Sequence, residues 1–136
     1  MAFAETVVDR EVLSGTCPVR VKLAERVYAG ACLAASSPNW ILSAHASGET
    51  PLLVAGTAGE VNDYIKAYPL AAIKVTTTLA NVATLGELVS LDDDGTFVAD
   101  TANYPDVGFV TEVGSDSLSA ELVVCPMIQQ LDTART

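Results

Sequence analysis

The segment ELVSLDDDGTFVAD, residues 87–100, restricts the fold more than any other stretch of the chain, because it places Asp-Gly between two apolar runs. This arrangement is among the strongest short-range signals for a β-hairpin. A tight turn needs a positive φ, which Gly95 adopts without strain, and the aspartates tolerate turn geometry while staying in water. The segment therefore predicts two antiparallel strands with a solvated acidic tip.

The rest of the chain also consists of short apolar runs and polar turns. Val19, Val21 and Leu23 alternate with polar or small residues, which is the period of a half-buried strand. Similar runs are VYAGACLAA, WILSA, PLLVAG, LAAIKVTTT, DVGFVTEV and SLSAELVVCP. Residues 60–69 predict at most a helical turn, which Pro69 ends. We predict an all-β fold: a compact small barrel or sandwich of about eight to ten short strands with an extended N-terminal arm.

Both ends of the chain are predicted to lie outside this β domain. Residues 1–16 fit neither a period of two nor one of 3.6, and predict an arm that either holds one short strand or docks onto a partner. The candidate contact residues are its apolar positions, Phe3, Val7, Val8, Val12 and Leu13. Residues 17–126 are predicted to form the β domain, and residues 127–136 a C-terminal tail along the surface.

A faint internal repeat supports this division into short strands. VYAGACLAASSPNWILSA and VATLGELVSLDDDGTFVA share an apolar start, a glycine, a short apolar run, a polar turn, an aromatic residue and a second apolar run. In this alignment Gly30 corresponds to Gly86, and Trp40 to Phe97. The repeat predicts two similar hairpins.

Charge and cysteine content narrow the range of partners. The formal net charge is −10, and ten acids but no Lys or Arg lie between Lys74 and Arg135. Such a surface repels phosphate, so nucleic acid is not an expected partner. The longest uncharged stretch, residues 27–48, is interrupted by a Ser-Ser-Pro-Asn turn, so no membrane span is predicted. Three cysteines without a CxxC pair, and no signal peptide, predict reduced thiols in a cytoplasm.

The chemistry-bearing residues form no catalytic or metal-binding motif. His45 is the single histidine and stands beside no nucleophile motif. Asp92–Asp94 are consecutive, so in an extended chain their side chains point to alternate faces, and Thr101 stands where a calcium loop needs a glutamate. We therefore predict no enzyme activity, no cofactor and no metal, although weak calcium binding at this turn stays open.

The second half of the chain resembles the small capsid decoration (cement) proteins of tailed bacteriophages and prophages. In that family a strand-turn-strand of the form GxxVxLdxdGtv precedes an xGfvxE strand and a final strand. The matching residues are Gly86, Leu88, Val89, Leu91, Asp94, Gly95, Thr96, Gly108, Phe109, Val110 and Glu112. The resemblance covers about residues 26–125, and its motifs are structural.

The resemblance implies a structural protein on the outside of an expanded phage capsid. Its partner would be the major capsid protein, whose subunits it would bridge and so stabilise, as a homotrimer at threefold positions of the shell. It would be made in the host cytoplasm and end on the virion. The N-terminal arm is our candidate for the segment that adds a strand to a capsid sheet.

Two other interpretations stay open. The first is another β-structured virion component, either a head-fibre base or a tail tube, and a ring of fixed size in isolation would favour the tail tube. The second is a small ligand-binding or ion-binding β-barrel that uses Asp92–Asp94, Glu87 or His45. A calcium-dependent rise in melting temperature would favour this last interpretation.

Overall fold

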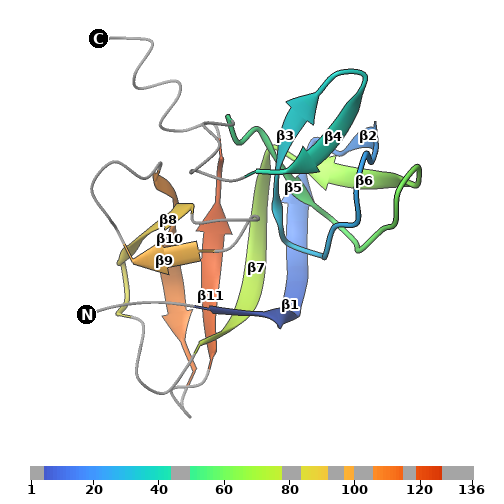
Figure 1. The fold of residues 1–136 in the computed structure, drawn as a ribbon. Helices are drawn as coiled ribbons and strands as arrows, with labels where there is room; N and C mark the ends of the chain where they lie inside the picture. Colours follow the sequence, from blue (N-terminus) through green and yellow to red (C-terminus); the bar gives the residue numbers. More distant parts are fainter. Residues whose placement is uncertain are drawn as a thin grey trace, which may run out of the picture.

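The structure is a computed structural model, and it describes residues 5–43, 50–77, 84–91, 97–99, 106–114 and 119–126. Within these residues the chain forms eleven β-strands in two antiparallel sheets and no helix, which confirms the all-β prediction (Figure 1). The acidic hairpin tip, His45, Phe3 and the C-terminal tail lie outside the described residues.

The larger sheet has six strands in the order β1-β7-β11-β10-β8-β9. Every neighbouring pair in it is antiparallel. Its members are β1 (Glu5–Thr16), β7 (Leu70–Thr77), β8 (Leu88–Leu91), β9 (Phe97–Ala99), β10 (Asp106–Val113) and β11 (Ser119–Val124). In Figure 1 this sheet occupies the left and centre of the molecule, with β1 and β7 side by side.

The smaller sheet has five strands in the order β2-β6-β5-β3-β4, and it is also antiparallel throughout. Its members are β2 (Val19–Lys22), β3 (Cys32–Ser36), β4 (Asn39–Leu42), β5 (Leu53–Ala55) and β6 (Tyr64–Tyr68). The chain passes from β1 to β2 through Cys17 and Pro18, and from β6 to β7 through Pro69 alone. The two sheets are therefore joined directly at two places.

The two sheets are two copies of one topology. When β1 is set aside, each sheet is built from five consecutive strands, β2 to β6 or β7 to β11. In both, the first strand of the half lies beside the fifth, followed in space by the fourth, the second and the third. The repeat predicted from the sequence is confirmed, and it extends over the whole of each half.

A matching pair of backbone hydrogen bonds aligns the halves residue by residue. In the first half the amide of Gly30 donates to the carbonyl of Ala55, and the amide of Ala55 donates to the carbonyl of Ala31, the residue after the glycine. Both bonds are 2.8 Å long. In the second half Gly86 and Val110 make the same two bonds at 2.9 Å. Gly30 and Gly86 have φ angles of 80° and 79°, which residues with a Cβ adopt only at a cost. Each glycine therefore makes the turn that precedes a hairpin, β3–β4 after Gly30 and β8–β9 after Gly86.

The hairpin predicted around Asp-Gly is present in the larger sheet. Strands β8 and β9 pair antiparallel, with Leu91 opposite Phe97 and Ser90 opposite Val98. Leu91 and Phe97 are buried, and the hydroxyl of Ser90 donates to Asp106 at 2.8 Å. The strand pairing is thus confirmed, whereas the tip itself, residues 92–96, lies outside the described part of the chain.

Residues 64–68 form strand β6, so the helical turn predicted for residues 60–69 is wrong. Ile65 and Ala67 point into the core while Tyr64 and Lys66 are exposed, which is the alternation of a strand. Backbone pairing with β2 and β5 on both sides holds this short segment extended. The local sequence does not reveal this, because Tyr64 and Tyr68 are also spaced by about one helical turn and strand β2, one of the two partners, lies more than forty residues away.

Residues 5–16 form one continuous strand of twelve residues along the edge of the larger sheet. Its pairing with β7 contains two register shifts, one between Thr6 and Glu11 and one between Val12 and Ser14. A bulge reverses the faces of the side chains that follow it. This explains why the sequence of the segment shows no period of two, although it is a strand.

Arg10 connects β1 to the other half of the molecule. Its Nη1 donates to the carbonyl of Gly30 at 2.6 Å, and its guanidinium lies 4.3 Å from the centre of the Phe97 ring and 5.1 Å from that of Tyr28. Burial lowers the pKa of Arg10 to about 10, although Tyr28 and Cys32 act in the opposite direction. The guanidinium stays charged at neutral pH, and the carbonyl and ring faces offset part of its lost hydration.

The two equivalent glycines give a matched pair of stability tests. We expect Gly86→Ala to lower the free energy of unfolding by about 1 kcal/mol, because its positive φ strains any residue with a Cβ. An added Cβ at Gly86 would meet nothing within 4 Å, whereas at Gly30 it would lie 3.2 Å from Cδ of Arg10. Gly30→Ala should therefore cost more. Chemical denaturation of both variants checks this, and an equal or reversed ranking would contradict it.

Candidate docking surfaces

The predicted contact residues of the N-terminal segment do not share one environment. Val12 pairs with Ile73 and is half-buried against the core of the larger sheet. Leu13 is the extra residue of the bulge and is 43% exposed. Val7 and Val8 lie in β1, where the structure describes the backbone only, and Phe3 lies outside the described residues. Val12 and Leu13 are the predicted contact residues whose side chains the structure describes, and of these two Leu13 faces solvent.

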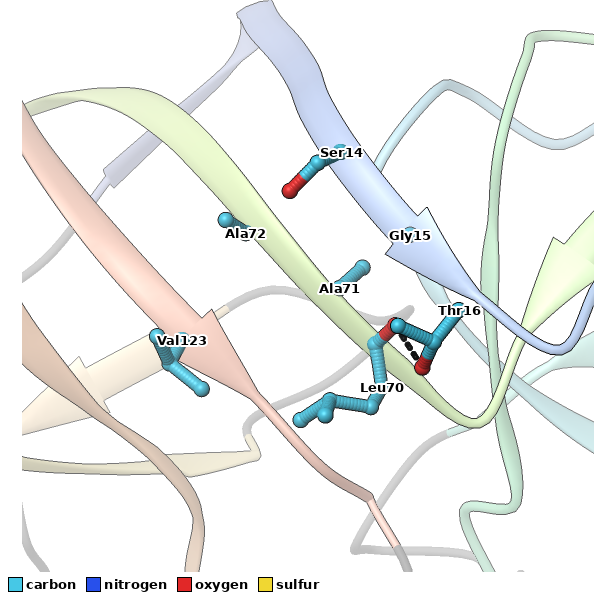
Figure 2. A pocket seen from close by; sticks show the side chains of 7 residues that line it. All are labelled: Ser14, Gly15, Thr16, Leu70, Ala71, Ala72 and Val123. Atoms are coloured by element: carbon cyan, nitrogen blue, oxygen red, sulfur yellow. Dashed lines mark hydrogen bonds between the residues drawn. The ribbon is translucent and has the colours of Figure 1, made fainter.

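A shallow groove lies beside the C-terminal end of β1. Figure 2 shows its lining from β1, β7 and β11, namely Ser14, Gly15, Thr16, Leu70, Ala71, Ala72 and Val123. Its volume is about 170 Å³, and its surface is mostly apolar. The hydroxyl of Thr16 donates to the carbonyl of Leu70 at 3.4 Å and so ties the two strands together at this end. A groove of this volume has room for one side chain of a partner, but it is too small to enclose a ligand of the size of a nucleotide.

An apolar row continues from this groove across the outer face of the larger sheet. Ala72 lies opposite Val123, Val123 opposite Phe109, and Phe109 opposite Leu88. Phe109 is 42% and Leu88 45% exposed. Contiguous exposed apolar side chains of this kind mark contact surfaces in soluble proteins. We call these four residues the apolar row.

A row of charged residues runs parallel to the apolar row on the same face. Lys74 lies opposite both Glu11 and Glu121, and Glu121 lies opposite Glu112. Two carboxylates placed directly opposite each other on neighbouring strands repel. We call Glu11, Glu112 and Glu121 the acidic row; with Lys74 it has a net charge of −2.

The outer face of the smaller sheet carries the opposite charge. Arg20 lies directly opposite Lys66, and Lys22 directly opposite Tyr64. The guanidinium of Arg20 is 4.0 Å from the centre of the Tyr64 ring, and the ammonium of Lys22 is 5.9 Å away. Tyr64 is 54% exposed. We call Arg20, Lys22, Tyr64 and Lys66 the basic face, and it holds three of the seven Lys and Arg residues of the chain.

Sequence reasoning did not find this basic face. The alternation of β2 placed Arg20 and Lys22 on one side of a strand, and this signal was used only to predict the strand. Lys66 could not be added to them, because residues 60–69 were not recognised as a strand. Pairing of β2 with β6 is what brings Arg20 and Lys66 together.

The part of the chain that the structure describes offers neither a metal cluster nor a membrane-spanning helix. The described ranges contain no group of three or more His, Cys, Asp or Glu side chains placed to hold a metal ion. His45 and Asp92–Asp94, which the ion-binding interpretation uses, lie outside them. Among the described elements there is no helix long and apolar enough to cross a bilayer.

Comparison with known proteins yields a match at the level of fold. No family model matches the chain, and no curated protein matches its sequence. Among solved structures, the N base of the head fibre protein gp8.5 of bacteriophage phi29 is similar, with a TM-score of 0.56 and 22% sequence identity. The match covers 79% of this chain and 92% of that chain. The two proteins therefore share a fold over nearly the whole of the phage domain.

The three free cysteines give a test of the interior of the structure. Cys17 is exposed, and Cys32 is fully buried beside Arg10. Burial raises the pKa of the Cys32 thiol to about 12, despite the opposing effect of Arg10, so at pH 8 it carries almost no reactive thiolate. We expect Ellman's reagent to label Cys17 rapidly and Cys32 only after unfolding. Labelling of Cys32 as fast as Cys17 in the native protein would contradict the burial of Cys32.

Proposed function

We propose that this protein is a structural component of a tailed-phage virion and attaches to the outside of the head as the base of a fibre. The observation that carries the proposal is the fold shared with the phi29 head fibre base over 92% of that domain. The resemblance of residues 86–112 to capsid decoration proteins points to the same location on a virion. Here the matching segments are strands β8, β9 and β10 of one sheet.

The proposed partner is the major capsid protein, and the proposed contact includes the edge strand β1. One edge of β1 pairs with β7, and β1 stands at the end of the sheet order, so a capsid strand would add to its outer edge. Leu13 lies on this strand and is exposed, so it would be buried by such a contact. Val12 instead packs against the core, so it would support such a contact only by stabilising β1.

A second candidate function is that of a cement protein, which the residues shared with the decoration family favour. A protein that binds only the assembled shell stabilises it by mass action, summed over many sites. A fibre base needs attachment to the head alone. The two functions therefore differ in whether the bound protein raises the resistance of the shell to heat.

We expect the purified chain to co-sediment saturably with heads of its own phage. Expanded and unexpanded heads should be compared, because a protein added late in assembly recognises the expanded lattice. Binding without a change in the thermal disruption of heads would identify a fibre base, and binding with increased resistance would identify a cement protein. Absence of binding to both forms of the head would refute the proposed function.

The role of β1 is best tested by point variants, because deletion of residues 1–16 would also leave one edge of β7 without its partner strand and remove Arg10. We expect Leu13→Asp to weaken head binding at least tenfold while leaving the melting temperature nearly unchanged, because this side chain is exposed. The matched control is Val12→Ala, which should lower stability by about 1–2 kcal/mol and leave binding intact once the protein is folded. Undiminished binding by Leu13→Asp would remove Leu13 from the contact.

A further inference from the structure

The two halves carry opposite charges at one pair of equivalent positions on their outer faces. The matching hydrogen bonds make Ala55 equivalent to Val110, and these residues pair with Ala67 and Leu122 respectively. The residue before each of these partners is Lys66 in the first half and Glu121 in the second. The residues opposite these two, Arg20 and Lys74, are both basic. The negative charge of the second face therefore comes from Glu121 together with its other neighbour, Glu112.

Each of these faces contains a pair of like charges in direct opposition. Arg20 lies opposite Lys66 on the basic face, and Glu112 lies opposite Glu121 in the acidic row. Such pairs destabilise an isolated sheet by up to about 1 kcal/mol each. A surface of the opposite sign that covers either pair offsets this repulsion, because Arg20, Lys66 and Glu112 each gain an attractive neighbour and Glu121 gains one besides Lys74.

Each face also offers exposed aromatic surface beside its charges. Tyr64 stands between Arg20 and Lys22 on the basic face, and its contact with the guanidinium holds both groups at the surface. Phe109 belongs to the apolar row, which runs parallel to the acidic row. Aromatic residues and arginine are the residue types that contribute most to protein contacts. Both surfaces therefore have the composition of an interface.

We propose that the basic face of one copy of this chain binds the acidic row and the apolar row of a second copy. The chain has a net charge of −10, so two copies repel unless the basic face lies at the contact. Within the described residues, the acidic row supplies the complementary charge on a face of the same architecture. The occupant of the basic face is therefore a second copy of this chain.

The contact joins two different surfaces, and this determines the kind of assembly. Each copy carries one basic face on the smaller sheet and one acidic row on the larger sheet, and the two sheets occupy different parts of the molecule (Figure 1). A contact between unlike surfaces is head-to-tail, and it forms closed rings or open chains rather than twofold dimers. This inference goes beyond the proposed function, because it concerns the free protein and requires no phage head.

Charge reversal of one face at a time tests the proposal with the full-length chain. The basic-face variant Arg20→Glu with Lys66→Glu changes the net charge from −10 to −14, because each substitution changes it by two units. The acidic-row variant Glu112→Lys with Glu121→Lys changes it from −10 to −6. The variant with all four substitutions returns to −10 with the complementarity restored. Each keeps a like-charge pair across the strands, but Glu121→Lys also lies opposite Lys74, and Arg20→Glu loses the contact with the Tyr64 ring. Thermal unfolding of each variant is therefore measured first, and association is compared among the folded proteins.

Sedimentation velocity over a range of concentrations gives the association of each protein. We expect the wild type to form oligomers, each two-substitution variant to associate at least tenfold more weakly, and the four-substitution variant to recover. The acidic-row variant separates complementarity from net charge, since lower net charge alone would make it associate more strongly than the wild type. Neutral variants, Arg20→Gln with Lys66→Gln and Glu112→Gln with Glu121→Gln, replace any reversal that fails to fold.

The proposal is overturned by a wild type that stays monomeric, by reversal variants that associate like the wild type, or by a four-substitution variant that does not recover. These outcomes are independent of head binding. A chain that forms oligomers but does not bind heads would contradict the proposed function alone. A chain that binds heads but stays monomeric would contradict the head-to-tail contact alone.

Discussion

The hydrogen bonds that Gly30 and Gly86 make with the fourth strand of each half are the constraint on which the rest of the structure depends. Each glycine has a positive φ, and its amide donates to the carbonyl of a residue in that strand. The amide of the same strand residue donates to the carbonyl of the residue after the glycine. This pair of bonds lies at the start of the hairpin and fixes the register of the hairpin against the fourth strand of that half. Because the same arrangement occurs twice, both halves reach the same strand order.

The two copies of this arrangement are connected by Arg10. Strand β1 has no counterpart in the smaller sheet, and it carries a charged side chain to the carbonyl of Gly30 in the other half. An added Cβ at Gly30 would lie against this side chain, whereas at Gly86 it would lie in open space. Gly30 therefore makes its own turn and also contacts Arg10, whereas Gly86 makes a turn alone. The same substitution at the two glycines thus separates the effect of the turn from that of the contact with Arg10.

The repeat also explains how one small domain presents two different surfaces. Duplicated halves retain the same core positions, since Ala67 and Leu122 are both fully buried. Outward positions are free to change, so Lys66 and Glu121 carry opposite charges on equivalent strands. The proposed attachment to a head uses the outer edge of β1, whereas the proposed association of copies uses the outer faces of the two sheets, and Glu11 is the member of the acidic row that lies on β1.

The sequence by itself determined the class of fold and several of its parts. Asp-Gly between apolar runs predicts the β8–β9 pairing, because this signal is local. The same order of glycine, apolar run, polar turn, aromatic residue and apolar run in two segments predicts the repeat. For residues 1–16 the sequence predicts only one short strand or a docking arm, because the bulges of the twelve-residue strand β1 break the alternation of its side chains. Strand β6 escaped prediction because five residues ending at a proline hold too little periodicity to outweigh a helical spacing of tyrosines.

Only the tertiary structure decided which charges meet. Alternation along a strand fixes the face on which a side chain lies, but it does not fix the neighbouring strand. Arg20 and Lys66 lie opposite each other because β2 pairs with β6, and Glu112 and Glu121 because β10 pairs with β11. The pairing of β2 with β6 depends on backbone hydrogen bonds between segments more than forty residues apart in the chain. The sequence therefore determined the charges, and the tertiary structure placed them on two complementary faces.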